Sequence, residues 1–159
     1  MSKIVDLNTL SDTQVQEVIV LMGELDPTIN VTARMVKQAV EAPGTHFFTV
    51  MVEDHIVGCA SLCVFDSPTG RKASVEDVVV ASAYRGQHLG KQLLQHVIEF
   101  AKKLAPISLQ LTSRPERDAA NRLYRSIGFK KRETNAYRME ILQHAVEPYI
   151  ELTGLGGGR

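Results

Sequence analysis

Arg85, Gly86, Gly90 and Lys91 have the residue types and the spacing expected of a site that binds a diphosphate group. They follow an apolar run that ends near Val80, and they open a regular amphipathic stretch. Glycine lets the backbone approach a ligand closely, and the free N–H groups at a helix start point toward an anion. Arginine adds a planar fork of donors, and lysine adds a point charge. The stretch therefore predicts a phosphate cradle between a strand and a helix.

Two common nucleotide-binding motifs do not fit this stretch. A P-loop has four residues between its glycines and a Ser or Thr after the Lys. Here three residues separate Gly86 from Gly90, and Gln92 follows Lys91. The GxGxxG fingerprint of dinucleotide-binding proteins is also absent from the sequence. We therefore expect neither an ATPase loop nor a dinucleotide site.

Side chains able to transfer protons occur on both sides of the cradle. Glu76 lies two residues before Val78, so the two share a face of a regular strand, whereas Asp77 points to the opposite face unless a bulge intervenes. Tyr124 lies one helical turn after Asn121, and a phenol with its ordinary pKa of about 10 keeps its proton at neutral pH. These residues could supply a general base and a general acid. The noncatalytic alternatives are surface carboxylates and a tyrosine at the edge of a buried helix face.

Two helices are expected before the first strands. Ser11 can cap the first helix with Gln14 three residues later, and this helix should end near residues 26–27. A second helix should begin at a Thr32 cap and end at the Ala-Pro-Gly break at residues 42–44. Both helices carry apolar residues along one face, so each should pack on a sheet.

The rest of the chain alternates strands and helices. Runs rich in β-branched and aromatic residues predict strands at 46–52, 56–65, 73–81 and 107–113, with a further hairpin at 129–141. A long amphipathic helix follows the cradle and ends near residue 104, and a short one that contains Tyr124 closes at Gly128. Because a helical crossover joins parallel strands, we expect an α/β fold with a mixed sheet.

Composition narrows the class of protein. A chain of 159 residues and 17.6 kDa fits one domain, which we place at residues 1–145, followed by a tail at 146–159. The 18 basic and 18 acidic side chains balance, which argues against a nucleic acid or an anionic membrane as partner. There is no apolar run of about 20 residues and no basic, apolar leader, so we expect a cytoplasmic protein.

Neither the cysteines nor the histidines suggest a metal site. Cys59 and Cys63 lie four residues apart in a predicted strand, so their Cα atoms should be about 13 Å apart. That distance is too long for a disulfide or for one shared metal ion. We expect reduced cysteines in the core and no bound metal.

These motifs resemble the GNAT superfamily of N-acetyltransferases. The acetyl-CoA signature of that family is Arg or Gln, two residues, Gly, one residue, then Gly or Ala, and it falls here on residues 85–90. His88 occupies the place of the first signature glycine, as a polar side chain does in glucosamine-6-phosphate N-acetyltransferases. The likeness extends to EDVVV with YRGQHLGK and to AANRLYRSIGF, which begins about 35 residues after YRGQHLGK begins. It implies a GNAT-type fold, a twisted mixed sheet flanked by helices.

The resemblance also implies roles for individual residues. Tyr124 would be the general acid, Glu76 the general base, and a backbone N–H near Val78 would polarise the thioester carbonyl. Asp77 and Arg114 would contact the acceptor. The residues implied in binding acetyl-CoA are Val78, Val79, Val80, Arg85, Gly86, Gln87, His88, Leu89, Gly90, Lys91 and Asn121.

The acceptor and the assembly stay open at this point. An amino-sugar phosphate is suggested by EDVVV and by Asn121 with Tyr124, while a protein N-terminus, a polyamine or an antibiotic is an alternative. A noncatalytic CoA-binding module is the rival class, and it would need neither Glu76 nor Tyr124. An exposed C-terminal strand would make a homodimer plausible.

Overall fold

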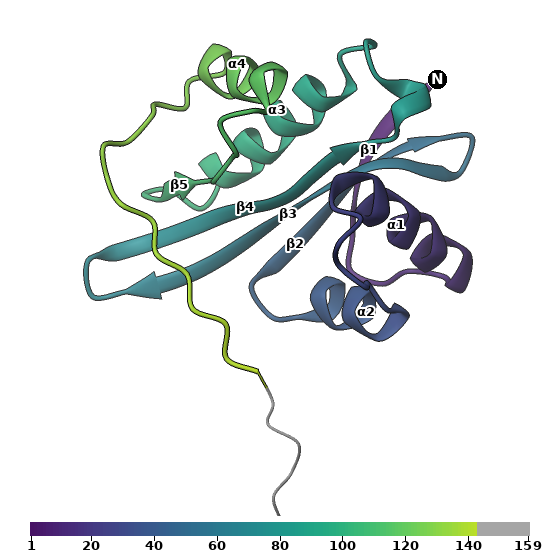
Figure 1. Cartoon of the computed structure of the whole chain (residues 1–159), viewed down its shortest axis with the longest axis horizontal. Coiled ribbons are helices and arrows are strands. Elements are labelled where there is room, and N and C mark those ends of the chain that lie inside the picture. The colour runs from purple at the N-terminus through teal and green to yellow at the C-terminus, as the bar shows by residue number, and fades with distance from the viewer. Residues whose placement is uncertain (143–159) are drawn as a thin grey trace, which may run out of the picture.

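A mixed β-sheet with helices on both faces forms the core of the computed structural model, which describes residues 1–142 (Figure 1). The predicted boundary between a domain at 1–145 and a tail at 146–159 lies outside the described residues. The elements, in chain order, are β1 (Ser2–Leu7), α1 (Asp12–Leu25), α2 (Ala33–Glu41), β2 (Thr45–Val52), β3 (His55–Ser67), β4 (Gly70–Val80), a one-turn 3-10 helix (Ser82–Tyr84), α3 (Leu89–Lys102), β5 (Ser108–Gln110) and α4 (Asp118–Ser126).

The five strands lie side by side in sequence order. Strands β1 to β4 pair antiparallel, and β5 pairs parallel to β4 after the crossover through α3. The predicted α/β class and the mixed sheet are therefore confirmed. Strand β1 was not predicted from the sequence, and it pairs with β2 from Ser2 opposite Val52 to Leu7 opposite Phe47.

The two faces of the sheet carry separate apolar cores. Helices α1 and α2 pack on one face through Val15, Val18, Leu21, Val36 and Val40. Helix α3 packs on the other face through Leu89, Leu93, Leu94, Val97 and Ala101, and Tyr124 of α4 joins that second core. Figure 1 shows α3 and α4 together, apart from α1 and α2. Any site that opens along β4 can thus receive side chains from both helical layers.

The predicted helix starts are confirmed by their caps. Ser11 and Gln14 form a reciprocal capping box, with Gln14 N–H donating to Ser11 Oγ at 3.2 Å and Ser11 N–H donating to Gln14 Oε1 at 2.9 Å. Thr32 Oγ1 accepts from Met35 N–H at 3.2 Å at the start of α2. These local interactions fix where α1 and α2 begin, and so where the loop between them lies over the sheet.

The predicted hairpin at residues 129–141 is wrong. Residues 129–142 form neither helix nor strand, and Figure 1 shows this segment leaving α4 in an extended course. Its apolar side chains at alternate positions, Tyr137, Met139 and Ile141, are at least 83% exposed. Strand β5 is also shorter than the predicted strand at 107–113, so it offers only three residues as an edge for pairing.

Three further findings concern the cysteines, metal binding and membrane-spanning helices. Cys59 and Cys63 are both free thiols, and burial raises the pKa of Cys59 to about 12. Within residues 1–142, no group of three or more His, Cys, Asp or Glu side chains is placed to hold a metal ion. In the same part of the chain, no helix is both long enough and apolar enough to cross a bilayer.

Candidate active site

A β-bulge in β4 determines which side chains reach the candidate site. Ser61 of β3 pairs with Glu76 and Cys59 pairs with Val79, so two steps on β3 match three steps on β4. Asp77 is the extra residue, and its φ of 53° lies in the left-handed region. A bulge at this position turns the strand and changes the alternation of its side chains.

Because of the bulge, the side chain of Glu76 does not have the predicted orientation. Val75 and Val78 both pack on the α3 side of the sheet, whereas Val79 packs on the α1 and α2 side. Glu76 therefore does not share a face with Val78, as a regular strand would require, but lies on the side of Val79. The prediction was wrong because one inserted residue reverses the alternation. Asp77 is brought to the same cavity as Glu76 instead of the opposite face.

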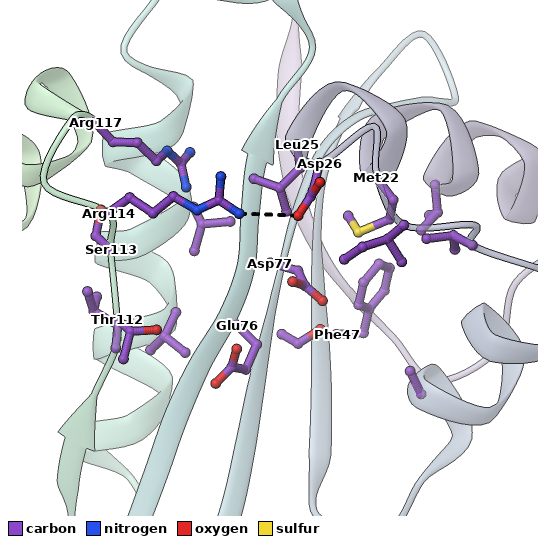
Figure 2. Close-up of a pocket in the computed structure, with 18 of the residues that line it drawn as sticks. Met22, Leu25, Asp26, Phe47, Glu76, Asp77, Thr112, Ser113, Arg114 and Arg117 are labelled. Carbon is purple, nitrogen blue, oxygen red and sulfur yellow. Dashed lines mark hydrogen bonds and ion pairs between the residues drawn. The ribbon is translucent and has the colours of Figure 1, made fainter. Parts of the chain in front are cut away.

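That cavity has a volume of about 1240 Å³ and lies between the two helical layers. Figure 2 shows Glu76 and Asp77 between the segment that carries Thr112, Ser113 and Arg114 and the apolar side chains of α1 and β2. Tyr124 of α4 also lines the cavity. The structure thus brings together the predicted acid, the predicted base and both predicted acceptor-binding residues.

The cavity opens because β4 and β5 separate. They pair only from Lys72 opposite Ser108 to Ser74 opposite Gln110, and β4 then continues alone to Val80. In the described residues, the edge of β4 beyond Ser74 has no strand partner on the β5 side. This separation of the two parallel strands leaves backbone N–H and C=O groups of β4 available to a ligand.

The two carboxylates differ in their surroundings. Ser74 donates a hydrogen bond to Glu76 from the same strand. The pKa of Asp77 is raised because burial penalises its charge and because the negative charge of Glu76 is adjacent. Two carboxylates side by side in a cavity favour binding of a cationic or proton-donating group between them.

Tyr124 faces the core and the cavity at once. Its side chain is 7% exposed, and its ring packs edge-on against Phe129 with centroids 6.3 Å apart. Burial raises the pKa of the phenol, while the positive charge of Arg117 acts in the opposite direction. Tyr124 therefore holds its proton at neutral pH, as a general acid must.

The predicted phosphate cradle has the backbone of an anion site. After the 3-10 turn, Gly86 has a φ of 80° and His88, the residue that caps α3, has a φ of 60°. His88 makes no side-chain cap, and the first helical bond runs from Gln92 N–H to His88 C=O at 3.0 Å. The amide groups of residues 89–91 precede that bond, so they are free to bind a ligand.

Two predicted cofactor ligands are engaged with the protein itself. Arg85 donates from Nε to the Val80 carbonyl at 3.1 Å and lies 3.5 Å from a carboxylate oxygen of Glu24 in α1. The Asn121 side chain donates to the carbonyls of Arg114 at 3.0 Å and Pro115 at 3.4 Å. Arg85 thus fixes the cradle turn against α1, and Asn121 fixes the loop that leads into α4.

The remaining predicted cofactor residues lie near the end of β4. Val78 lines the cavity, while the side chain of Val79 is buried in the core and can act only through its backbone. A Cβ atom at Gly90 would lie 3.8 Å from both Val80 and Leu123, which places the start of α3 against β4 and α4. Gln87 and Lys91 are exposed, and residues 85–91 do not line the main cavity.

An ion pair that the sequence analysis missed crosses the cavity. Arg114 Nη2, in the loop after β5, lies 3.4 Å from Asp26 Oδ2 at the end of α1 (Figure 2). The pKa of Asp26 is lowered, first by hydrogen bonds from Thr28 and then by the charge of Arg114. The partners are 88 residues apart, so no sequence signal could have linked them.

This fold and site define a class of protein. The family model described as the acetyltransferase (GNAT) family matches residues 16–129, which is more than half of the chain. The chain belongs to this family. Its five-stranded mixed sheet with flanking helices is the fold of solved acetyltransferases. One from Agrobacterium tumefaciens covers 87% of this chain and 99% of its own, with a TM-score of 0.76 and 20% identity.

The individual relatives are diverse. The chain is 31% identical over 107 residues to a probable glucosamine 6-phosphate N-acetyltransferase of Drosophila melanogaster, covering 64% of this chain and 48% of the relative. It is 29% identical over 90 residues to the N-alpha-acetyltransferase RimI of Mycobacterium tuberculosis, covering 57% and 55%. A solved aminoglycoside acetyltransferase from an uncultured soil sample has a TM-score of 0.75 at 19% identity, covering 89% of this chain and 97% of its own. The chain spans about half the length of the curated relatives it matches.

Proposed function

We propose that this chain is an acetyl-CoA-dependent N-acetyltransferase that transfers the acetyl group directly to a small amine in a ternary complex. The observation that carries the proposal is the convergence of Glu76, Asp77 and Tyr124 on one cavity beside the unpaired edge of β4. Membership of the GNAT family supplies the reaction class. A carboxylate can accept the proton that the amine loses, and a protonated phenol can donate a proton to the leaving thiolate.

The residues fit acetyl-CoA on structural grounds. The start of α3 has no side-chain cap, and a Cβ atom added at Gly86 would meet nothing within 4 Å, so there is open space at the cradle. We propose that the amides of residues 89–91 hold the diphosphate and that the β4 edge near Val78 and Val80 holds the pantetheine arm. When bound, acetyl-CoA would supply the activated acetyl group.

The protein groups would then divide the proton transfers. We propose that Glu76 remains the base that takes a proton from the amine, with Asp77 sharing this role because its raised pKa makes it a better proton acceptor than an ordinary aspartate. The backbone N–H near Val78 would face the oxygen on which negative charge develops. Tyr124 would hold the proton that the leaving group needs.

The acceptor is proposed to be a small molecule because the cavity is bounded by helices on one side and by the loop after β5 on the other. An amino-sugar phosphate, the acceptor suggested by the sequence, stays a prediction. The named relatives act on different acceptors, so their likeness does not select one. A homodimer and a cytoplasmic location likewise stay predictions of the sequence.

Thiol release from acetyl-CoA across a panel of amines tests the proposal. Replacing Tyr124 by Phe removes the proton donor while keeping the ring that packs on Phe129, so we expect kcat to fall about 100-fold or more. The affinity for acetyl-CoA should change little. Tyr137→Phe is the matched control because that side chain is 91% exposed.

Two results would count against the proposal. An unchanged kcat in Tyr124→Phe would remove Tyr124 from the mechanism. Tight binding of CoA without thiol release from any amine would favour the rival reading, a noncatalytic CoA-binding module, over an enzyme.

A further inference from the structure

One wall of the cavity is apolar. It is formed by side chains of α1, β2, α2 and the loop between the two helices, among them Met22, Leu25, Ile29, Val31, Met35 and Phe47. Ile29 is 51% exposed and Met35 is 45% exposed, so part of this wall has no apolar partner within the described residues. A polyhydroxylated acceptor would leave these apolar side chains in contact with polar groups and water, whereas an apolar substituent would bury them.

The opposite wall is polar and carries two arginines and one acidic residue. Arg114, Glu116 and Arg117 line it in the loop after β5, next to Ser113. Ser113 Oγ is the single buried side-chain nitrogen or oxygen within residues 1–142 that has no hydrogen-bond partner. A buried hydroxyl without a partner in the protein calls for an explanation, and a bound water, ion or ligand group is one such explanation. Its neighbour in the sequence, Arg114, is the residue that spans the cavity to Asp26.

The ion pair between Arg114 and Asp26 is weak enough for a ligand to take the place of Asp26. Its N to O distance is 3.4 Å, and the Arg114 side chain is 75% exposed, so the pair is weak and its arginine is accessible. Asp26 uses its other oxygen, Oδ1, to accept hydrogen bonds from Thr28 N–H at 3.0 Å and Thr28 Oγ1 at 2.6 Å. Asp26 can therefore release Arg114 without losing the turn that holds it.

We propose that the acceptor is an amine that carries both a carboxylate and a large apolar substituent, such as an α-amino acid with an apolar side chain. This inference rests on the proposed function and names the acceptor of the same site. The acceptor carboxylate binds Arg114 in place of Asp26, with the unpartnered Ser113 hydroxyl as a second donor. The apolar substituent lies on the α1 and α2 wall, and the amine lies at Glu76 and Asp77.

The layout of charge supports this arrangement over the alternatives within the cavity. Arg114 and Arg117 come from the loop after β5, whereas Glu76 and Asp77 come from β4, so a molecule with both charges can meet an opposite charge at each end. An amine without an anionic group would leave Arg114 paired with Asp26. An amino-sugar phosphate would satisfy Arg114 but would place hydroxyl groups against Ile29 and Met35.

Thiol release by the full chain with a set of four probe amines tests the inference. L-phenylalanine has all three groups, L-phenylalaninamide lacks the carboxylate, glycine lacks the apolar group, and glucosamine 6-phosphate carries a phosphate on a polar body. We expect kcat/KM to be highest for L-phenylalanine. Each methylene group that the apolar wall covers should contribute about fourfold to kcat/KM.

Variants of the ion pair separate the carboxylate contact from differences in amine basicity. We expect Arg114→Gln to lower the ratio of kcat/KM for L-phenylalanine to that for its amide about tenfold, because only L-phenylalanine loses a hydrogen bond from Arg114 to its carboxylate. The intrinsic reactivity of each amine cancels when this ratio is compared between the variant and the unmodified chain. Asp26→Asn keeps an oxygen for Thr28 but frees Arg114. It should lower KM for L-phenylalanine about two- to fivefold and leave KM for the amide unchanged.

A second ion pair of the same kind is the matched control. Arg71 Nε lies 3.0 Å from Asp66 Oδ1 at the turn between β3 and β4, and neither residue lines the cavity. Arg71→Gln and Asp66→Asn should leave two quantities as in the unmodified chain: the ratio of kcat/KM for L-phenylalanine to that for its amide, and KM for L-phenylalanine. Equal effects of the two arginine substitutions would overturn the inference, because they would reflect net charge alone.

The remaining outcomes separate this inference from the proposed function. If the chain releases thiol with amines but prefers glucosamine 6-phosphate or the amide, the inference fails and the proposed function stands. If no amine supports thiol release, calorimetric titration of L-phenylalanine in the presence of CoA decides. Binding that Arg114→Gln abolishes would support the acceptor site without the reaction, and no binding would overturn it.

Discussion

Replacing His88 by glycine tests whether the backbone of the cradle has the conformation described above. His88 has φ of 60° and ψ of 15°, and a residue other than glycine pays about 1–2 kcal/mol for a left-handed conformation. Glycine has no such penalty but loses about 0.5–1 kcal/mol more backbone entropy on folding. The difference predicts that His88→Gly raises the free energy of unfolding by about 0.5–1 kcal/mol.

Denaturation by urea, followed by circular dichroism, measures this change, and thermal unfolding should show a rise in Tm of about 1–4 °C. Gln87→Gly is the control, because Gln87 is the neighbouring residue and does not have a positive φ. We expect it to lower the free energy of unfolding by about 0.5–1 kcal/mol. The two substitutions should therefore have opposite signs at adjacent positions.

The same variant tests how the cradle would hold a diphosphate. If the backbone amides of residues 89–91 bind it, His88→Gly should retain the affinity for acetyl-CoA within a few-fold. A loss of more than about tenfold with stability unimpaired would show that the imidazole, and not the backbone, is the main ligand. A loss of stability equal to that of Gln87→Gly would refute the left-handed conformation itself.

Three further predictions follow from the site and the core. Glu76→Gln should lower the pKa of Asp77, measured by NMR titration of its carboxyl carbon, because the adjacent charge helps to raise that pKa. Leu93→Ala should lower the free energy of unfolding by about 2–5 kcal/mol in urea, because Leu93 is 0% exposed. Glu17 raises the pKa of His55, so the stability that this pair provides is present below the ordinary histidine pKa and lost as pH rises through the raised value. Glu17→Gln should flatten this pH dependence of Tm.

The elements that sequence predicted well are those whose signals are local. Ser11 with Gln14 and Thr32 with Met35 lie within one helical turn, so their caps can be read from the residues themselves. The amphipathic stripe of α3 is likewise periodic in the sequence. The turn at residues 85–91 could be located from the sequence because glycine at a helix start has a conformational reason that does not depend on the rest of the fold, while its role as a phosphate cradle stays a prediction. His88 at φ of 60° also explains why the family signature has glycine at that position.

The features that sequence missed depend on a partner elsewhere in the chain. Strand β1 is an edge strand whose pairing with β2 is its main support, and its own residues have a mixed exposure pattern. The hairpin at residues 129–141 is the opposite case, because it was predicted and does not form. Its alternation of apolar residues is present, but the described structure gives it no adjacent strand with which to pair. Alternation is therefore necessary for a strand and not sufficient.

The bulge at Asp77 is the clearest case, because it decides the chemistry of the site. The register of β4 against β3 is visible only when both strands are placed, and it moves Glu76 from the side of Val78 to the side of Val79. The same inserted residue leaves Val78 and Val80 on the α3 side, close to the cradle. One strand can thus present two carboxylates to the cavity between the helical layers while its backbone edge faces the gap beside β5. A regular β4 would instead turn the side chains of Glu76 and Asp77 to opposite faces of the sheet, so the bulge is what brings the two carboxylates side by side.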